Sequence, residues 1–474
     1  MSMHKLLLFL FSIICFGCQN SNSSDVIDYS ENIHLHLSEQ AVEAEGAGSV
    51  ITLEIEVDDL SFLEFVAVRK LKNNEPVRRM EDMPKNKFIN NKQVFEYTIQ
   101  EEDIKGDLAF SFIPVDINNH YGKETNVQVD ILSRTKQLYP TDAVKIARIT
   151  GKSLSGEILP NPNVTHEKYN IGGTDLGIFW IMEENKVGMV FGDTFGKDWY
   201  PGNTPDWRSN VLAISSDLNL DDGITFDKMI CEPDKNAKQI IYSAHDTSGK
   251  GDYSSIPTAG IRLNGTDYIH YMNVKAWTPN WITNYSGYAV STDDGESWNL
   301  QPNLFSTSSK FAQLSLWARE NWIYTIGSIV GRRGLPYLAR FKADNILHPD
   351  KYEYWNKDKG WLVGDETSVT PLFGNYINEM YAEPTLVYSE YYKRWITVYF
   401  NEIKYELVMR DAEEITGPWS EEKVIITGKD YPKLYGGFIY PLNLDKPGIY
   451  ISLSQWDPLY NVFLMKVNLQ YIKE

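Results

Sequence analysis

The sequence predicts an all-β protein, in which an immunoglobulin-like β-sandwich over residues 28–134 precedes a five-bladed β-propeller over residues 137–474. Three observations predict this fold. Apolar and polar residues alternate in short runs throughout the first segment, as they do in half-buried strands. After residue 137 a unit of three apolar runs recurs five times, without helical periodicity. One of these units also contains a turn motif that is typical of propeller blades.

Each of the five repeats is centred on an apolar run that is expected to form a middle strand. These runs are residues 187–192, 268–274, 322–330, 395–401 and 449–456. The expected first strands are residues 175–181, 256–263, 311–319, 383–388 and 437–442, and the expected third strands are residues 211–216, 287–292, 337–342, 405–410 and 462–467. Repeated multi-strand units favour a propeller, and a large β-sandwich is the competing fold. Residues 144–149 are expected to close the ring by pairing with the last repeat.

The turn motif lies at residues 291–298, whose sequence STDDGESW fits the Asp-box pattern of propeller blades. In this pattern the Asp and Gly residues form the turn and the Trp packs below it. Residues 219–226 are a degenerate copy. We expect these aspartates to be structural, because the box shapes a blade hairpin away from the mouth of the channel.

The expected sandwich shows clear strand patterns at residues 50–57, 93–99, 107–113 and 126–131. Several short alternating strands in a segment of this length are typical of an immunoglobulin-like fold. The segment contains no catalytic motif, so we interpret it as a spacer or support for the second domain.

The N-terminus is typical of an exported bacterial lipoprotein. A short basic region and an apolar stretch over residues 6–16 end at a sequence that looks like a lipobox, with Cys18 as the lipidated residue. Residues 1–18 are therefore expected to be a lipoprotein signal peptide, and residues 19–27 a polar tether. A plain secretory signal is the alternative. The expected location is the outer membrane, on its periplasmic or cell-surface side.

Charge and composition exclude several functions. The formal net charge of −19 argues against nucleic acids and anionic membrane surfaces as partners, so the lipid anchor is the only expected membrane contact. No phosphate-binding loop, nucleophile elbow or His-rich metal motif occurs, and no cofactor is expected. A calcium ion bound by clustered acids stays possible.

Two aspartates placed symmetrically about a turn carry the functional prediction. Asp175 and Asp193 are equally distant in sequence from Glu184, which lies in the turn between two strand-like runs. A hairpin centred on Glu184 sets the two aspartates opposite each other, with Cβ atoms roughly 4.5–5.5 Å apart. At this distance one carboxyl pKa should rise while the other stays low. A glycosidase needs such a pair, one protonated acid and one ionised partner. Two turn-flanking aspartates that pair by chance are the alternative.

Propeller geometry predicts a ring of polar side chains at the mouth that the two aspartates share, because each first strand starts there and each middle strand returns there. The same reasoning places five polar residues at this mouth: Asn273, Glu383, Asn401, Tyr440 and Gln455, of which all but Asn401 are substrate-binding candidates. Each is a polar residue at a strand end, which is common in any β protein.

The loops beyond the middle strands are rich in aromatic residues. Trp277 and Trp456 lie on such loops and suit stacking against sugar rings, although Trp is also a typical residue of protein interfaces. Arg208 is expected to orient a carboxylate through a charge-assisted hydrogen bond, or to bridge a blade edge.

Several motifs resemble one bacterial family over roughly residues 140–474. They are residues 172–177 (GGTDLG), 191–196 (FGDTFG) and 207–210 (WRSN), with similar segments at residues 435–438 (YGGF) and 454–456 (SQW). The family was catalogued as domain of unknown function 4185 and is now glycoside hydrolase family 183, the endo-D-arabinanases. The resemblance implies a five-bladed propeller that cleaves internal bonds of D-arabinofuranan, such as mycobacterial arabinogalactan or lipoarabinomannan. It implies catalytic carboxylates at Asp175 and Asp193, and it makes Asn210 a further substrate-binding candidate.

The expected function is therefore endo-hydrolysis of D-arabinan by a pair of aspartates. The sandwich and lipobox lie outside the resemblance and look like those of Bacteroidetes-type polysaccharide-degrading lipoproteins. A non-catalytic glycan-binding propeller and a protein-interaction propeller are the alternatives, and the facing aspartates favour the enzyme. Neither the identity of the acid nor the stereochemical outcome follows from the sequence.

Overall fold

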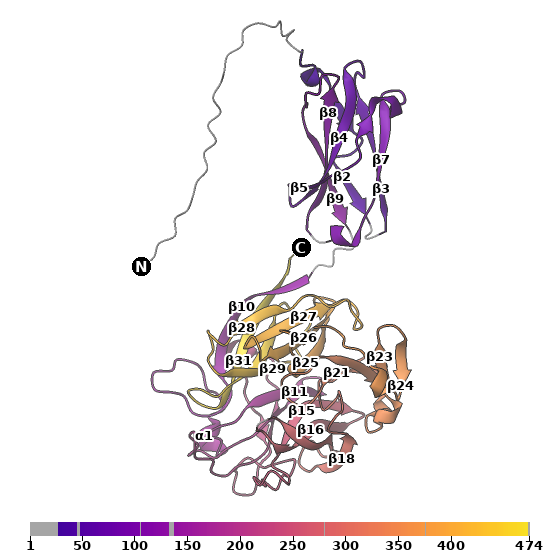
Figure 1. Cartoon of the computed structure of the whole chain (residues 1–474). Coiled ribbons are helices and arrows are strands. Elements are labelled where there is room, and N and C mark those ends of the chain that lie inside the picture. The colour runs from indigo at the N-terminus through magenta and orange to yellow at the C-terminus, as the bar shows by residue number, and fades with distance from the viewer. Residues whose placement is uncertain are drawn as a thin grey trace, which may run out of the picture. The chain divides into compact units, whose positions relative to one another are not determined.

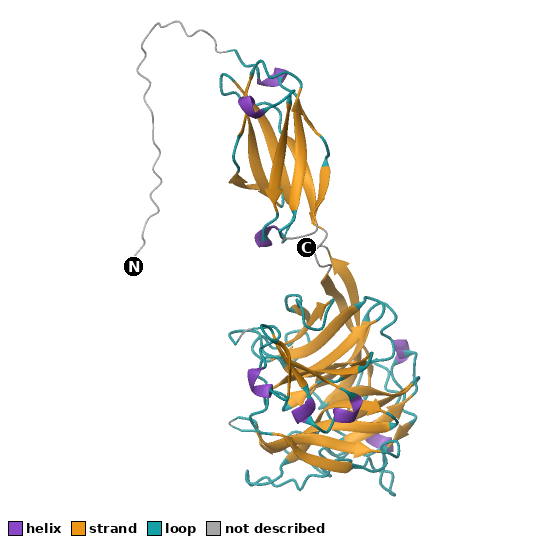
Figure 2. Ribbon diagram, turned by 90° about the vertical axis from the view of Figure 1, so that its right-hand side faces the viewer, coloured by secondary structure: helices purple, strands orange, loops and turns teal. Residues whose placement is uncertain are grey.

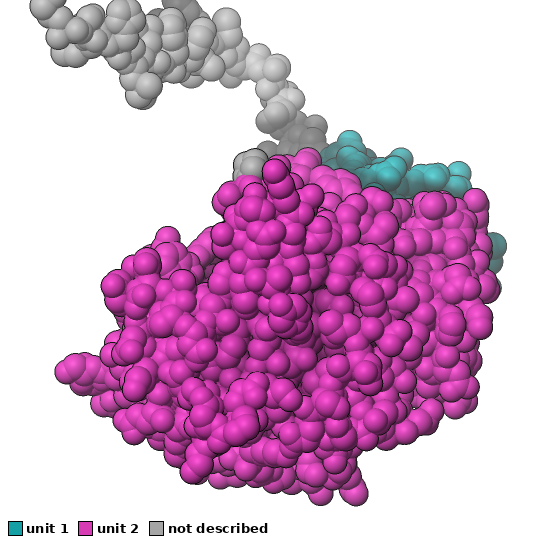
Figure 3. Space-filling model, turned by 90° about the horizontal axis from the view of Figure 1, so that it is seen from below, with its two compact units in different colours: residues 1–136, 473–474 teal, residues 137–472 magenta. Residues whose placement is uncertain are grey.

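The computed structural model describes residues 27–44, 48–104, 106–131, 137–278, 280–374 and 376–472. The chain forms two compact units, which are coloured separately in Figure 3. Unit 1 comprises residues 1–136 and 473–474, and unit 2 comprises residues 137–472. Strands dominate both units. The described residues contain one short α-helix, α1 (Thr165–Lys168), and several 3-10 helices of three residues each, which are purple in Figure 2. The expected all-β class is confirmed. Within the described ranges, no helix has the length and apolar character needed to cross a bilayer.

Unit 1 consists of two sheets that share one apolar core. One sheet contains β1 (Leu35–Leu37), β3 (Val50–Val57) and β7 (Lys92–Thr98). The other contains β2 (Ala41–Ala44), β9 (Thr125–Ile131), β8 (Leu108–Asp116), β4 (Leu63–Lys72) and β5 (Glu75–Arg79), with β6 (Met83–Pro84) beside β4. Alternate residues of β3 are buried, as its sequence pattern predicts, and they pack against residues of β8 in the common core.

Unit 2 contains five antiparallel sheets, shown in Figure 1. The first has β11 (Leu176–Glu183), β12 (Lys186–Phe191), β13 (Val211–Ser215) and β14 (Lys228–Met229); the second has β15 (Ser254–Leu263), β16 (Thr266–Ala276), β17 (Ile282–Ser291) and β18 (Asn299–Phe305). The third has β19 (Gln313–Leu314), β21 (Trp322–Ser328), β22 (Tyr337–Phe341), β23 (Glu353–Asn356) and β24 (Gly360–Val363), with β20 (Trp317–Arg319) beside β21. The fourth has β25 (Ala382–Ser389), β26 (Arg394–Asn401), β27 (Glu406–Ala412) and β28 (Lys423–Thr427); the fifth has β29 (Leu434–Ile439), β30 (Ile449–Gln455), β31 (Asn461–Ile472) and β10 (Gln137–Arg148).

The first strands of the five sheets form a closed ring. β11 contacts β15, β15 contacts β19, β19 contacts β25, β25 contacts β29, and β29 returns to β11. The ring is also closed through the backbone, because β10 from the start of the unit pairs with β31 at its end. This pairing confirms the closing strand expected near residues 144–149. The middle strands are buried on both faces, which explains why they read as continuous apolar runs rather than alternating ones.

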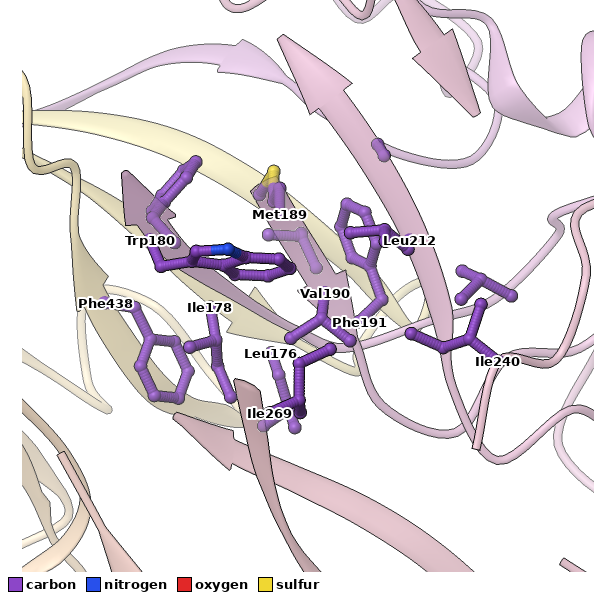
Figure 4. Packing of buried hydrophobic residues seen from close by; sticks show 14 of the residues in the cluster. Leu176, Ile178, Trp180, Met189, Val190, Phe191, Leu212, Ile240, Ile269 and Phe438 are labelled. Carbon is purple, nitrogen blue, oxygen red and sulfur yellow. The ribbon is translucent and has the colours of Figure 1, made fainter. Parts of the chain in front are cut away.

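Trp180 shows how neighbouring sheets pack (Figure 4). It lies on β11 opposite Gly188 of β12, and its indole also lies against Gly260 of β15 in the next sheet. A Cβ atom at Gly188 would lie 2.3 Å from the indole, and one at Gly260 would lie 2.5 Å from it. The indole N–H donates to Asp267 at 2.9 Å, so the ring is held in the gap that the two glycines leave.

The Asp-box turn connects β17 to β18 as expected. Asp293 accepts hydrogen bonds from the backbone N–H and the hydroxyl of Ser297, at 3.0 and 2.6 Å. The Trp298 indole donates to the Gly295 carbonyl at 2.9 Å and packs against the core. Because β17 ends here opposite the start of β16, the turn lies away from the end of β16 that carries Trp277. These aspartates therefore shape a hairpin.

Candidate active site

The first sheet brings Asp175 and Asp193 to the same end of the ring. Asp175 lies directly before β11, and Asp193 lies just beyond the end of β12. Both are half-buried and line one cavity of about 450 Å³. Residues at the corresponding ends of all five sheets contribute to its wall.

The hairpin register differs from the expected one where it matters for the aspartates. Pairs from Ile178–Val190 to Ile181–Val187 follow the predicted register, but Leu176 pairs with Phe191 after a one-residue shift. The backbone N–H of Gly192 donates to the Asp175 carbonyl at 3.1 Å. Direct pairing of Asp175 with Asp193 across two strands is therefore wrong. A bulge with positive φ at Leu176 and Gly177 causes the shift, and both carboxyls still reach the cavity.

Asp175 is held by tyrosines and carries a raised pKa. The Tyr435 hydroxyl donates to Oδ2 at 2.8 Å, whereas Oδ1 is buried without a hydrogen-bond partner. Burial raises the pKa of Asp175 to about 7, against the opposing effect of the nearby Tyr460 and Tyr435 hydroxyls. The nearby carboxyls of Asp193 and Glu383 raise it further.

Asp193 is held by two donors on a single oxygen. The Trp207 indole and the Ser254 hydroxyl donate to Oδ1 at 2.7 and 2.6 Å. Burial raises the pKa of Asp193 to about 6, and these two hydrogen bonds oppose the rise. The expectation that one carboxyl keeps a low pKa is therefore wrong, because burial dominates at both positions.

A third carboxyl, Glu383, lies in the same cavity at the start of β25. Arg332, from the loop between β21 and β22, donates to its Oε1 from Nε and Nη2 at 3.0 and 2.6 Å. The other carboxylate oxygen, Oε2, is buried and has no hydrogen-bond partner. The cavity thus contains three carboxyls and one guanidinium.

The remaining wall is largely aromatic. Two predicted tryptophans, Trp277 and Trp456, line the cavity. So do the following aromatic residues: Phe195, Trp199, Trp281, Tyr405, Tyr435, Phe438 and Tyr460. Aromatic faces beside carboxyls suit a sugar ring, which presents apolar C–H faces and hydroxyls together.

Two predicted binding residues brace the loops around Asp193 and do not line the cavity. The Arg208 guanidinium donates to the carbonyls of Asp206, Ala237 and Asn170 at 2.7–3.1 Å, so it orients no catalytic carboxylate. Asn210 is fully buried, donates to two carbonyls and accepts from two backbone N–H groups. Their role here is to satisfy buried backbone groups.

Three further candidates also lie outside the cavity lining. Asn273 bonds to Asp252, Ser255 and Asn284. The Tyr440 hydroxyl donates to the Asp217 carbonyl at 2.7 Å, and its ring packs in the core. Gln455 bridges Lys145 and the Pro432 carbonyl at 2.9 and 2.8 Å. Position at a strand end was a poor guide, because these side chains turn to neighbouring loops and strands.

The sequence reasoning missed Arg332, Tyr435, Tyr460 and Ser254 as site residues. Tyr435 lies in a motif that resembles the family, and Tyr460 lies in the loop after Trp456, so both carried a sequence signal. Arg332 and Ser254 carried none, because their partners Glu383 and Asp193 are distant in sequence.

The described residues contain one cluster of three potential metal ligands, Asp28, Asp116 and His120 in unit 1. Asp116 already accepts hydrogen bonds from the backbone N–H groups of Tyr29, Asn118 and His120, which identifies the cluster as a loop brace. The predicted lipidation residue, Cys18, lies outside the described residues.

Comparison with known proteins identifies similar chains. Notoamide biosynthesis cluster protein J of Aspergillus sp. (strain MF297-2) is 29% identical over 316 residues, which cover 62% of this chain and 82% of that protein. Its counterpart J′ of Aspergillus versicolor is 28% identical over 307 residues, covering 61% and 82%.

Solved structures with a similar arrangement include two glycoside hydrolases, each 10% identical to this chain with a TM-score of 0.40. One is an exo-β-1,3-galactanase from Phanerochaete chrysosporium, matched over 70% of this chain and 67% of that one. The other is a family 117 glycoside hydrolase from Zobellia galactanivorans, matched over 70% and 90%.

Residues 160–466 match the model of a protein family described as domain of unknown function (DUF4185). This range contains Asp175, Asp193, Glu383 and Arg332, and it confirms the resemblance of the sequence motifs to domain of unknown function 4185. The chain therefore belongs to the DUF4185 family.

Proposed function

We propose that this protein is an endo-acting glycoside hydrolase that cleaves internal D-arabinofuranosyl linkages, with Asp175 and Asp193 as its catalytic carboxyls. The observation that carries the proposal is this pair of carboxyls with raised pKa, which face one aromatic-walled cavity. Among the described residues, neither forms an ion pair. Burying a carboxyl without a cation costs folding free energy. A role in proton transfer accounts for that cost.

The hydrogen bonds favour different roles for the two aspartates. Asp175 has the higher pKa and an unpartnered Oδ1, so it suits the acid that gives its proton to the glycosidic oxygen as the bond breaks. Asp193 receives two hydrogen bonds that stabilise its anion, so it suits the carboxylate that attacks the anomeric carbon or removes a proton from the attacking water.

The cavity and its surroundings favour a neutral polysaccharide. Three carboxyls against one guanidinium disfavour an acidic sugar, and the aromatic wall offers stacking surfaces. Aromatic side chains are also exposed on neighbouring loops, with Tyr200 and Tyr242 61% and 69% exposed. A surface of this kind suits several consecutive sugar units, as endo-cleavage requires. The choice of D-arabinan rests on the family resemblance of the motifs.

The proposal extends to the architecture and the location of the chain. We propose that unit 2 is a five-bladed β-propeller, which the cyclic contacts of its five first strands support. We propose that unit 1 is an immunoglobulin-like spacer behind a lipid anchor at Cys18, which would place the enzyme at the outer membrane. Incorporation of labelled palmitate, lost in Cys18→Ala, tests the anchor.

The activity is tested by reducing-end release from mycobacterial arabinogalactan, with plant L-arabinan as the control polymer. The wild-type protein should release oligosaccharides from D-arabinan alone, and Asp175→Asn and Asp193→Asn should each abolish release. Asp198→Asn is the matched control, because Asp198 is exposed on a neighbouring loop and should leave turnover unchanged. Binding of D-arabinan without any release by the wild type would favour a glycan-binding function instead.

A further inference from the structure

Glu383 is held in an unusual way for a buried carboxyl. It is 9% exposed, and its backbone adopts φ of 49°, which is uncommon for a non-glycine residue. Backbone strain of this kind persists only where surrounding contacts hold it, and it is frequent at functional sites. At Glu383 those contacts include the two hydrogen bonds from Arg332 and one from its own N–H to Gln313 Oε1 at 3.4 Å.

The two oxygens of Glu383 have different environments. Oε1 accepts both hydrogen bonds from Arg332, and Oε2 accepts none although it is buried at the cavity wall. Oε2 lies beside Gly436, where a Cβ atom would be in ordinary van der Waals contact with this oxygen at 3.6 Å. An unpartnered, buried carboxylate oxygen is costly unless a ligand supplies a donor.

Arg332 is fixed from several sides. Its guanidinium carbon lies 5.1 Å from the ring centre of Trp281, 5.2 Å from that of Phe400 and 4.8 Å from that of Tyr435. Tyr435 also donates to Asp175, so Arg332 and the proposed acid share one neighbour. The free oxygen of Glu383 therefore belongs to the same pocket as the acid.

We propose that Arg332 is a positioning residue that holds Glu383 so that Oε2 accepts a hydrogen bond from a hydroxyl of the sugar bound beside Asp175. This inference rests on the proposed hydrolase function. The site would then select a sugar that carries a hydroxyl at the position facing Oε2. An ether oxygen or a hydrogen atom at that position would leave Oε2 without a hydrogen-bond donor.

The test uses the full chain, a defined D-arabinofuranosyl oligosaccharide, and analogues that each lack one hydroxyl. For the wild type, one analogue should lose about tenfold to a hundredfold in kcat/KM, the usual range for a hydrogen bond to a charged group. In Glu383→Gln the same analogue should lose much less relative to the parent. Arg332→Met should reduce the discrimination in the same way. Arg333→Met is the matched control, because Arg333 is exposed and pairs with Glu402 at 3.5 Å, and it should discriminate as the wild type does.

Equal losses for every analogue in the wild type and in Glu383→Gln would overturn the inference while leaving the hydrolase function intact. If the wild type cleaves none of these compounds, the same contact can be tested without turnover. Calorimetry then measures the binding of each compound to Asp193→Asn and to the double variant Asp193→Asn/Glu383→Gln. If loss of one hydroxyl weakens binding to Asp193→Asn but does not weaken binding to the double variant, this result supports the contact. Affinity that is independent of every hydroxyl, or no binding at all, overturns it.

Discussion

At the scale of single residues, the proposed mechanism requires one protonated and one ionised carboxyl in a shared cavity. Burial raises the pKa of both Asp175 and Asp193, and neighbouring hydroxyl or indole donors oppose the rise at both. The charges of Asp193 and Glu383 raise the pKa of Asp175 further. Glu383 adds negative charge near Asp175, and Arg332 forms an ion pair with Glu383. The side chains that lower the pKa of the two aspartates donate from hydroxyl or indole groups. Such neutral donors stabilise the carboxylate anion but do not hold the group in its ionised form as a salt bridge would.

Replacing Tyr435 should change the pH dependence of turnover. Its hydroxyl stabilises the anion of Asp175, so Tyr435→Phe should raise the pKa of Asp175 further. Because the acid must be protonated, the basic limb of the kcat/KM profile should move to higher pH by about half a unit to one unit. Tyr405→Phe, which also lies in the cavity wall, is the control. An unchanged basic limb in Tyr435→Phe would contradict the assignment of Asp175 as the acid.

Removing the buried charge at Asp175 should stabilise the protein in a pH-dependent way. The native carboxyl keeps its proton up to pH about 7, whereas the unfolded carboxyl loses it above about 3.8. Between these values the native state binds more protons, so wild-type stability falls as pH rises. Asp175→Asn should therefore melt about 2 °C or more above the wild type at pH 8, and at nearly the same temperature at pH 4. If the melting temperatures of Asp175→Asn and the wild type differ by the same amount at pH 4 and at pH 8, this account is wrong.

At the scale of elements, most strands could be predicted because their patterns are local. The three main strands of each repeat follow from apolar runs, and β3 has the predicted bounds. The outer strands β14, β18 and β28 were missed because they are short or only partly buried. The bulge at the start of β11 was missed for another reason: Leu176 N donates to Ser454 Oγ of β30, a contact between the first and last sheets that no local pattern contains.

The same limit explains why several predicted binding residues do not line the cavity. Asn273 and Gln455 look like Glu383 in the sequence, as polar residues at strand ends, and Asn210 was a candidate through the motif at residues 207–210. Which of them reaches the cavity depends on neighbouring segments. Asn210 and Gln455 donate to backbone carbonyls, whereas Asn273 bonds to the side chains of Asp252, Ser255 and Asn284. Arg332 was missed because its partner Glu383 comes from the next sheet.

The packing of Trp180 between sheets predicts a specific sensitivity. In Gly260→Ala the new Cβ would overlap the indole, which should cost about 1–3 kcal/mol of unfolding free energy. A smaller side chain removes the overlap, so adding Trp180→Leu to Gly260→Ala should cost less than the two single changes together. Denaturant unfolding of the four proteins measures this coupling. Full additivity would show that the ring and the glycine do not constrain each other.

At the scale of the whole molecule, unit 2 contains every residue of the cavity together with its own core. Pairing of β10 with β31 closes its sheets, and Arg148 on β10 is buried between Glu157 and Asn461. Repetition of one strand unit made this ring predictable from the sequence. The side chains that meet in the cavity come from distant segments of the chain, and only the structure shows which of them reach it.

Unit 2 should therefore fold and act without unit 1. A chain of residues 137–474 should give a cooperative melting transition and release reducing ends at nearly the full-length rate. A chain that starts at residue 150 lacks β10, and it should lose the cooperative transition because the edge of β31 is left unpaired. Loss of activity in the 137–474 chain despite a normal melt would show that unit 1 takes part in the reaction.

The most direct test of the central claim is reducing-end release from mycobacterial arabinogalactan by the wild type and by Asp193→Asn, with Asp198→Asn and plant L-arabinan as controls. The account predicts oligosaccharides from D-arabinan with the wild type and with Asp198→Asn, and none with Asp193→Asn. It predicts no release from L-arabinan. Undiminished release by a correctly folded Asp193→Asn protein would contradict the account.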